Sequence, residues 1–404
     1  MQTRTAPSDG ARAASVRLPS DGFRILALFG SAILLGAERA NIEALAALKE
    51  HGCDVLCLIR DEEWSTLVPP ALEARGLACK KVPYIEHRLP GRALHTLARN
   101  PAAFVRANWN FLRIVREYRP THIHAYGQLF VLNFLIGLNL IRTPMVFRAG
   151  DEPTLHNWFW RATWRFVVRR TARFVANAEF VARSLRANGV TAEKITVIYN
   201  TAPARPSPPR TALELQLPAG TRAFAYIGQI SEHKGPHVLI DAFRELASEF
   251  PQARLFLAGR ISDWEGDAWA RALRDATRAD PLIGDRVTFL GQIEDVPGLL
   301  AQCEALVVPS LFDDPSPNVV MEAKQAGRAV IAFPRGGLPE LIDDGTDGLL
   351  CREATKSALV QALKTYLEHP AMAQEHGAAA RIRTRFGNTR FGASWREVYA
   401  TTTA

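Results

Sequence analysis

The sequence has few cysteines and no arrangement of them that would bind zinc or form a disulfide framework. Its 404 residues include five cysteines, and no two of them form a C-x-x-C pair. Zinc modules and small disulfide-held secreted domains both depend on closely spaced, paired cysteines, so the sequence argues against both classes. We expect a protein that works in a reducing, cytoplasmic environment.

Long apolar runs are also lacking. The longest, residues 129–141, has 13 residues and includes Asn133, Gly137 and Asn139, whereas a helix that spans a bilayer needs about 20. Residues 1–22 have no apolar core of the signal-peptide kind, and their Ala, Ser, Pro and Arg content predicts a flexible leader. We therefore expect no export, and we expect residues 129–141 to form a buried helix.

Positive charge is concentrated in the first half of the chain. Residues 1–200 contain 27 Lys and Arg against 16 Asp and Glu, and the remaining residues contain 22 against 25. Such an excess predicts contact with a phospholipid surface, a lipid-diphosphate acceptor or nucleic acid, unless the arginines only improve solubility. No zinc-finger, recognition-helix or RNA-binding aromatic motif accompanies the charge, so specific nucleic-acid binding is not expected.

Two stretches of this half, residues 88–119 and 156–170, combine cations with aromatic side chains. Basic amphipathic segments with Trp and Phe are typical of membrane interfaces. In the second stretch, Trp160 and Trp164 also have the spacing of a stripe that faces a protein core. The sequence therefore leaves two interpretations open for these stretches. One is peripheral contact with the inner face of the cytoplasmic membrane, and the other is ordinary core packing.

Short apolar, β-branched segments alternate with longer amphipathic ones, which is typical of parallel α/β sheets. A first series occupies residues 23–200 and a second occupies residues 211–387. Between them, residues 201–210 contain four prolines, which suit neither a helix nor a central strand, so we assign a linker there. Residues 388–404 have an apolar stripe at helical spacing and are expected to dock as a helix, with the N-terminal domain as the candidate partner.

Polar residues after the apolar strands are candidate ligand contacts, because ligands bind at the carboxyl ends of parallel strands. Lys234 stands before a predicted helix start, and an ammonium beside free helix amides suits a diphosphate. Asp314 precedes a second predicted helix start at residues 316–319. Glu322, one turn into that helix, can accept hydrogen bonds from both hydroxyls of a ribose. A solvated lysine, a helix cap and a surface carboxylate are the alternatives.

Four segments in this order resemble the retaining glycosyltransferase family four: GAER (36–39), GQISEHKG (228–235), DPSPNVVMEA (314–323) and GGLPELI (336–342). The resemblance covers nearly the whole chain after residue 22. It implies the GT-B fold, an α/β arrangement in which two Rossmann-like domains face each other across a cleft. It also implies transfer of a hexose or N-acetylhexosamine from a UDP- or GDP-sugar to a glycan or lipid-linked acceptor, with retained anomeric configuration and without metal or other cofactor. Cell-surface polysaccharide or glycolipid synthesis is the expected context.

The resemblance also implies roles for single residues on the donor side. Lys234 is expected to bind the donor diphosphate, Glu322 the ribose and Asp314 the hydroxyls of the transferred sugar. Asp314 stands where the family usually has Glu, and Gln229 stands where it usually has Arg, with Arg260 as the candidate replacement for that cation. The other expected donor-binding residues are Gly228, Ser316, Pro317, Asn318 and Val319.

On the facing side, Tyr126 or His124 is expected near the reacting sugar, because the family often has His at the position of Tyr126. A structural role is the alternative for His124. Gly36, Arg148 and Asp151 are expected to line the acceptor side of the cleft. The replaced residues leave open a nucleotide-sugar-binding scaffold with weakened catalysis, and a sugar epimerase or phosphorylase on the same fold is the other alternative.

Overall fold

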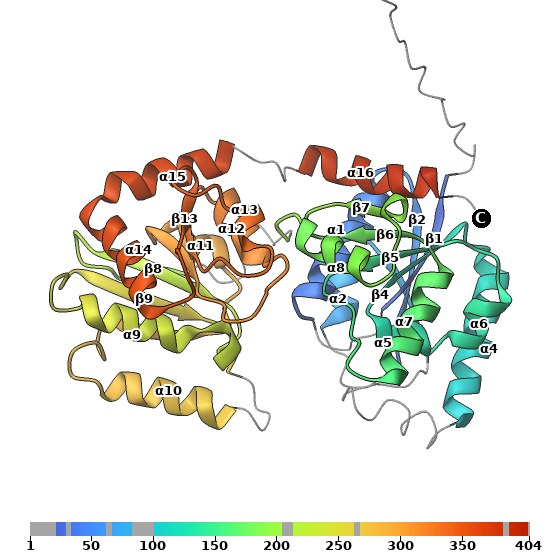
Figure 1. Ribbon diagram of the computed structural model, residues 1–404, viewed down its shortest axis with the longest axis horizontal. Helices are drawn as coiled ribbons and strands as arrows, with labels where there is room; N and C mark the ends of the chain where they lie inside the picture. Colours follow the sequence, from blue (N-terminus) through green and yellow to red (C-terminus); the bar gives the residue numbers. More distant parts are fainter. Residues whose placement is uncertain are drawn as a thin grey trace, which may run out of the picture.

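The computed structural model describes residues 22–29, 34–61, 67–82, 101–203, 213–261, 267–382 and 388–402. These residues form two domains that lie side by side, each with a parallel β-sheet and packed helices (Figure 1). The prediction of two parallel α/β domains is confirmed. Most of the predicted leader (residues 1–21), residues 88–100 of the first basic stretch and residues 204–210 of the predicted linker lie outside the described residues.

The N-terminal sheet has seven strands in the order β3-β2-β1-β4-β5-β6-β7, and all neighbouring strands are parallel. Their order reverses between β1 and β4, and in open parallel sheets the ligand crevice lies outside the carboxyl ends at such a point. The strands are β1 (Arg24–Leu28), β2 (Asp54–Arg60), β3 (Ala78–Val82), β4 (His122–Tyr126), β5 (Met145–Ala149), β6 (Thr171–Ala176) and β7 (Ile195–Val197).

Helices cover both faces of this sheet, so its central strands are apolar on both sides. In β1, Ile25 and Ala27 pack into one hydrophobic cluster, and Leu26 and Leu28 pack into another on the opposite face. The described helices of this domain are α1 (Gly36–Glu50), α2 (Val68–Ala74), α4 (Pro101–Tyr118), α5 (Gln128–Leu132), α6 (Leu135–Leu140), α7 (Trp158–Arg170), α8 (Glu179–Ala187) and the short 3-10 helix η2 (Ala192–Lys194).

The apolar run at residues 129–141 is not one buried helix, and that prediction is wrong in two respects. The run is divided between α5 and α6, and Ile136 and Leu140 are exposed. The side chain of Asn108 on α4 explains the interruption, because it donates to the carbonyl of Asn133 at 2.9 Å and accepts from the amide of Gly137 at 2.8 Å. These bonds replace the ones that a continuous helix would make.

The C-terminal sheet has six parallel strands in the order β10-β9-β8-β11-β12-β13, with the reversal between β8 and β11. They are β8 (Arg222–Ile227), β9 (Ala253–Ala258), β10 (Val287–Gly291), β11 (Ala305–Val308), β12 (Ala329–Ala332) and β13 (Gly348–Leu350). The helices described here are η3 (Glu232–Lys234), α9 (Pro236–Leu246), α10 (Asp267–Ala279), α11 (Val296–Ala301), α12 (Asn318–Gln325), α13 (Leu338–Leu341), α14 (Lys356–Glu368) and α15 (Pro370–Ile382).

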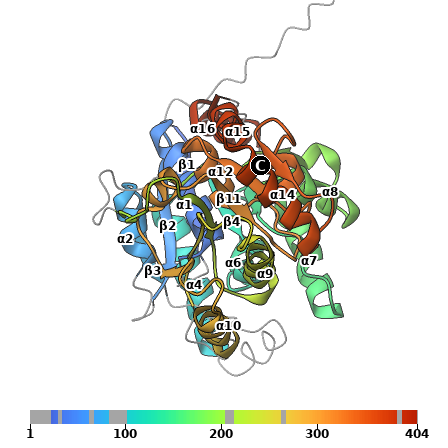
Figure 2. The same ribbon diagram turned by 90° about the vertical axis from the view of Figure 1, so that its left-hand side faces the viewer.

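The last helix, α16 (Asn388–Thr401), packs against α1 of the N-terminal domain. Trp395, Val398 and Tyr399 on α16 are buried in the hydrophobic cluster of that domain. Figures 1 and 2 show α15 and α16 along the same edge of the molecule, one over each domain. The chain therefore crosses between the domains twice, once after β7 and once before α16.

Candidate functional site

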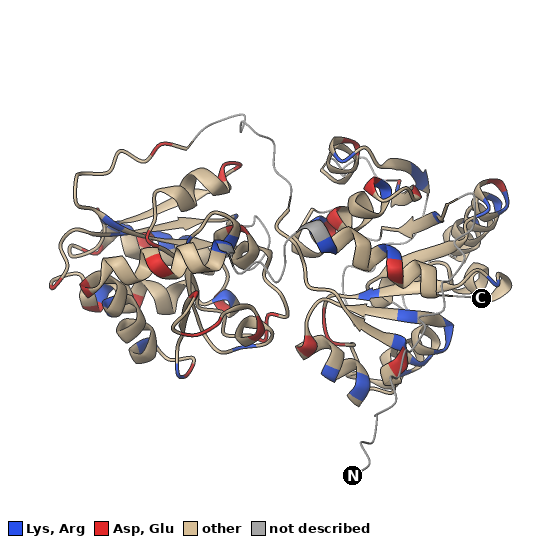
Figure 3. Cartoon of the chain, turned by 90° about the horizontal axis from the view of Figure 1, so that it is seen from above, with Lys and Arg blue, Asp and Glu red and all other residues tan. Residues whose placement is uncertain are grey.

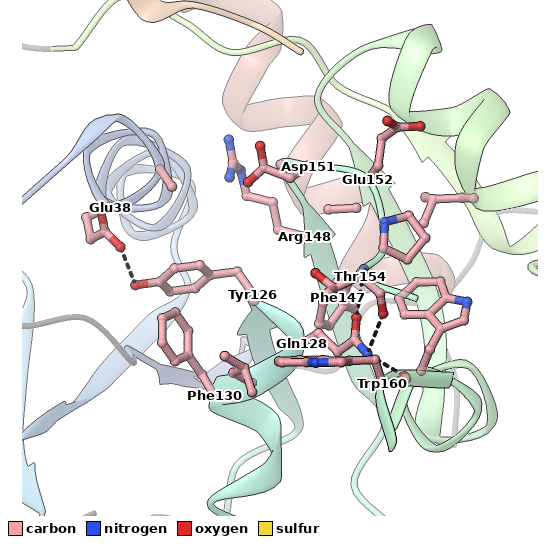
Figure 4. A pocket seen from close by; sticks show the side chains of 18 residues that line it. Glu38, Tyr126, Gln128, Phe130, Phe147, Arg148, Asp151, Glu152, Thr154 and Trp160 are labelled. Atoms are coloured by element: carbon pink, nitrogen blue, oxygen red, sulfur yellow. Dashed lines mark hydrogen bonds between the residues drawn. The ribbon is translucent and has the colours of Figure 1, made fainter. Parts of the chain in front are cut away.

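The candidate site lies where strand ends of the two sheets meet. On the N-terminal side there is a pocket of about 360 Å³. Side chains from α1, the ends of β4 and β5, the loop after β5 and α7 line it (Figure 4). On the C-terminal side are η3, the loop before α12 and the start of α12, which carry the residues expected to bind the donor.

The N-terminal half of the site contains a buried cation among carboxyl groups. Arg148, at the end of β5, is 3% exposed, and its charge interacts with Asp151 and Glu38. Burial lowers the pKa of Arg148 to about 10, so it remains cationic at neutral pH. Burial also raises the pKa of Asp151 and of Glu38. The hydroxyl of Tyr126 donates to Glu38 Oε1 at 3.5 Å and faces it in the pocket (Figure 4).

In the C-terminal half, Lys234 and Asp314 form an ion pair although they are far apart in sequence. The ammonium of Lys234 lies 2.6 Å from Asp314 Oδ2 and also 4.6 Å from the centre of the Phe312 ring. The next residue, Gly235, has φ of +72°, and a Cβ there would lie 2.0 Å from the carbonyl oxygen of Pro309. Only glycine fits at this turn, and the turn places Lys234 beside Asp314.

The start of α12 offers backbone amides to a ligand. Pro317 is the N-cap residue, and no side chain of the described residues caps this helix end. Asn318 and Val319 are its first two residues, so their amides have no partner within the helix and carry the positive end of its dipole. Ser316 is buried, and within the described part of the chain its hydroxyl has no hydrogen-bond partner. Glu322 is half-buried one turn further along α12.

Gln229 and Arg260 occupy neighbouring loops at the carboxyl ends of β8 and β9, and both are exposed. The amide of Ile230 donates to the carbonyl of Arg260 at 3.2 Å, which joins the two loops. Their close approach depends on glycine, because a Cβ on Gly259 would lie 1.7 Å from the carbonyl oxygen of Gly228. The structure thus brings Gly228, Gln229 and Arg260 together.

Direct hydrogen bonds join the two halves of the site. Arg148 Nη2 donates to Asn200 Oδ1 at 2.6 Å, and Asn200 Nδ2 donates to the carbonyl of Ser316 at 3.2 Å and to Asn318 Oδ1 at 3.1 Å. Asn318 Nδ2 in turn donates to the carbonyl of Gly36 at 3.0 Å. Sequence reasoning missed Asn200, whose only sequence signal is its place as the last residue before the linker.

His124 does not line the pocket, so the expectation that places it near the reacting sugar is wrong. It is fully buried between the sheet and α16, with Nδ1 2.6 Å from the hydroxyl of Tyr399 and Nε2 3.1 Å from Asn41 Oδ1. Burial lowers the pKa of His124 to about 3, so the ring is neutral at physiological pH. His124 and Tyr126 are two positions apart on β4 and so face the same side of the sheet, but Tyr126 is the last residue of the strand. Tyr126 is the one that lines the pocket.

No cluster of three or more His, Cys, Asp or Glu side chains that could hold a metal ion occurs in the residues that the structure describes. Metal independence stays a prediction.

Two parallel-sheet domains, joined across the site by hydrogen bonds from Asn200 to Ser316 and Asn318, have the GT-B architecture that many glycosyltransferases share. The comparisons agree with this class. Residues 35–203 match the family model described as Glycosyltransferase Family 4, and residues 221–369 match the one described as Glycosyl transferases group 1. The chain belongs to this glycosyltransferase family.

Curated relatives match over part of their lengths. The glycogen synthase of Mycobacterium tuberculosis is 28% identical over 66% of this chain and 65% of its own length. The lipopolysaccharide core biosynthesis glycosyltransferase LpsD of Rhizobium meliloti is 26% identical over 69% of this chain and 74% of its own. Spore coat protein SA of Bacillus subtilis is 30% identical over 33% of this chain, and the match spans 36% of that protein.

Solved structures show the same fold over nearly the whole chain. Anabaena HepE, crystallised with UDP and glucose, has a TM-score of 0.73 and 22% identity, and the match covers 94% of this chain and all of that chain. Sucrose-phosphate synthase from Thermosynechococcus elongatus has a TM-score of 0.75 and 20% identity, covering 93% of this chain and 98% of that chain. The predicted GT-B fold is confirmed.

Proposed function

We propose that this protein transfers a hexose or N-acetylhexosamine from a UDP- or GDP-sugar to a glycan or lipid-linked acceptor, with retention of anomeric configuration and without a metal ion. The observation that carries the proposal is the arrangement of Lys234, Asp314 and the start of α12 opposite the pocket that contains Arg148 and Asp151. Asp151 and Asp314 come from different domains, yet their charges interact. This interaction between the domains supports a site in which the residues proposed for the donor and those proposed for the acceptor lie close together.

The donor side suits a nucleoside diphosphate as leaving group. As the bond to the sugar breaks, negative charge develops on the diphosphate, and Lys234 together with the first amides of α12 would stabilise it. Glu322 would accept hydrogen bonds from the ribose hydroxyls. The crystal structures of Anabaena HepE with UDP and with UDP-glucose support a donor of this type, since their fold matches that of this chain.

The acceptor side suits a hydroxyl compound. The pocket contains aromatic side chains such as Tyr126, Phe130 and Trp160, which can pack against the apolar face of a sugar ring. Glu38, Asp151 and Arg148 supply hydrogen-bond partners for its hydroxyls. The similarity to a lipopolysaccharide core glycosyltransferase supports an acceptor in cell-surface glycan or glycolipid synthesis.

Nucleotide binding tests the donor assignment before any acceptor is known. We expect UDP or GDP, at 100 times its dissociation constant, to stabilise the folded protein by about 2.7 kcal/mol, measured as a rise in melting temperature. In Glu322→Ala the rise should shrink, and the KM for donor should increase more than kcat falls, because ribose contacts are equal in the ground and transition states.

Glu375→Ala is the control for this experiment, because Glu375 is an exposed carboxylate on α15. A Glu322→Ala variant that binds nucleotide normally but turns over slowly would move Glu322 from the ribose to the reacting sugar. Binding without transfer to any acceptor would favour the scaffold, and free sugar released without an acceptor would favour an epimerase.

A surface on the N-terminal domain supports peripheral membrane contact. Helices α4 and α6 pack together, and four of their apolar side chains form an exposed set that we call the outer patch. These side chains are Val105 and Trp109 on α4, with 59% and 72% of their surface exposed, and Ile136 and Leu140 on α6, with 44% and 68%. Arg106, Arg113 and Arg116 are exposed on α4, and Figure 3 shows Lys and Arg on the outer helices of this domain, at the right.

The second basic stretch, on α7, is different. Trp160 and Trp164 are 1% and 5% exposed and pack inward, so they follow the core-packing alternative, whereas Trp158 is exposed. No helix in the described ranges has both the length and the apolar character to cross a bilayer. Any membrane contact through the outer patch would therefore be interfacial.

We expect the protein to sediment with vesicles that contain an anionic phospholipid at low salt, and less so as salt screens the arginines. Trp109→Ala combined with Leu140→Ser should reduce binding several-fold, because both changes remove apolar area from the outer patch. Leu67→Ser is the control, since Leu67 is 52% exposed outside the patch. Equal vesicle binding by the wild type, the double variant and Leu67→Ser would contradict a membrane role of the outer patch. So would the absence of vesicle binding at any salt concentration.

A further inference from the structure

Helix α8 of the N-terminal domain is capped by a residue of the C-terminal domain. Its own N-cap residue, Ala178, has no side chain that can accept a hydrogen bond. Instead, the carboxylate of Glu340 on α13 accepts from the amides of Glu179 and Phe180, at 2.7 and 2.6 Å. A carboxylate at a helix N-terminus satisfies free amides and interacts favourably with the dipole. The cap thus joins the two domains through charge-assisted hydrogen bonds.

Two further donors from the N-terminal side reach the same carboxylate. The hydroxyl of Tyr199 donates to Glu340 Oε2 at 3.2 Å, and Arg183 Nη2 lies 3.4 Å from Oε1. The Glu340 side chain is only 15% exposed. Both oxygens of the carboxylate are therefore used, and an amide in its place would offer one acceptor oxygen and turn an N–H toward one of these donors.

The loop that leads to Glu340 is bonded to the loop that carries Asp314. The amide of Gly337 donates to the carbonyl of Asp314 at 3.0 Å. A Cβ on Gly337 would lie 1.8 Å from the carbonyl oxygen of Pro315 and 3.2 Å from the Cβ of Ala178, so glycine lets three backbone segments meet here. Because of these contacts, a shift of Glu340 relative to α8 would also shift Asp314 relative to the N-terminal domain.

Two consecutive residues at the end of the N-terminal domain, Tyr199 and Asn200, bond to the loop that leads to Glu340 and to the loop that carries Asp314. Tyr199 bonds to Glu340, and Asn200 bonds to Ser316 and Asn318, which follow Asp314. Asn200 also accepts from Arg148. Both loops are therefore bonded to the N-terminal domain, the Asp314 loop through Asn200 and the Glu340 loop through the carboxylate of Glu340.

We infer that Glu340 is a positioning residue, whose carboxylate caps α8 across the domain boundary and so holds Asp314 opposite Arg148 and Asp151. The inference rests on the proposed transfer reaction for its consequence, but the cap itself is independent of it. Glu340 is not among the residues that line the pocket beside Arg148 and Asp151. Its effect would pass through the orientation of the two domains, which decides whether donor and acceptor groups meet.

The test compares Glu340→Gln with Glu375→Gln, the matched change at an exposed carboxylate. In the Glu340 variant we expect kcat/KM for transfer to fall about tenfold or more, as expected for the loss of one charge-assisted hydrogen bond. UDP binding should stay unchanged, because Lys234 and Glu322, which are expected to contact UDP, both belong to the C-terminal domain and do not depend on how the two domains are oriented. Tyr199→Phe, which removes one neutral donor, should give a smaller fall in the same direction. Unchanged transfer in Glu340→Gln would overturn the positioning role.

Hydrogen exchange at the amides of Glu179 and Phe180 tests the cap without any activity. These amides should be protected in the full chain and should exchange faster in Glu340→Gln and, to a lesser degree, in Tyr199→Phe, while Glu375→Gln leaves them unchanged. Equal exchange in wild type and Glu340→Gln would overturn the inference even if transfer falls, because the loss would then have another cause. Faster exchange in an otherwise folded variant would uphold the cap, even if no transfer is found and the proposed function fails.

Discussion

Lys234→Ala is expected to lower the turnover of donor by about 100- to 1,000-fold, the usual cost of removing one group that stabilises charge developing in the transition state. Lys234 is the side-chain ammonium beside the start of α12, and its present partner is the carboxylate of Asp314 at 2.6 Å. In the variant, the rise in melting temperature caused by UDP or GDP should also largely disappear. The lower turnover and the smaller rise in melting temperature would both result from the loss of one interaction with the diphosphate.

Lys364→Ala is the matched control, because Lys364 is also paired with a carboxylate, Glu249, at 2.6 Å, but on the outer side of the C-terminal domain. It should leave turnover and nucleotide binding as they are. Steady-state kinetics and thermal unfolding of both variants make the comparison. If Lys234→Ala keeps wild-type turnover and nucleotide affinity, the diphosphate does not bind at Lys234.

Asp314→Asn should separate catalysis from nucleotide binding. We expect kcat to fall about 100-fold, because the change removes the carboxylate that we propose to hold the hydroxyls of the transferred sugar at the reacting centre. UDP should bind at least as tightly as before and up to several-fold tighter, because a negative charge near the diphosphate is removed and Lys234 loses a competing partner. Calorimetric titration with UDP and initial rates give the two quantities.

Asp280→Asn is the control for Asp314→Asn, since Asp280 pairs with Arg244 at 2.6 Å away from the cleft. Weaker UDP binding in Asp314→Asn would mean that Asp314 holds Lys234 in place for the nucleotide. In that case its main role is to orient the cation, and the contact with the transferred sugar must come from another residue.

The sequence predicted the fold well because the signals for it are local. Apolar segments such as FRILALF and RAFAYIG are apolar on both faces, and they become central strands with helices on each side. The glycines after them mark places where backbones meet, as the contact of Gly259 with Gly228 shows. Each of these features depends on a few neighbouring residues.

Predictions failed where the outcome depended on a distant residue. Residues 129–141 are apolar enough for one helix, but Asn108 from α4 binds the backbone where α5 and α6 separate. His124 and Tyr126 belong to the same strand, and only the packing of α1 and α16 shows that His124 is enclosed by Asn41 and Tyr399. No pattern near these residues carries that information.

The sequence by itself determined two parallel α/β domains and the family to which they belong, because strand periodicity, glycine turns and helix starts are encoded within short segments. Only the tertiary structure decided how the domains meet. The bridge from Asn200 to Ser316 and the Glu340 cap on α8 join residues of the two domains that are 116 and 161 positions apart. Such contacts arise when complete domains pack together, so the part of the site that spans the cleft has no local sequence signal.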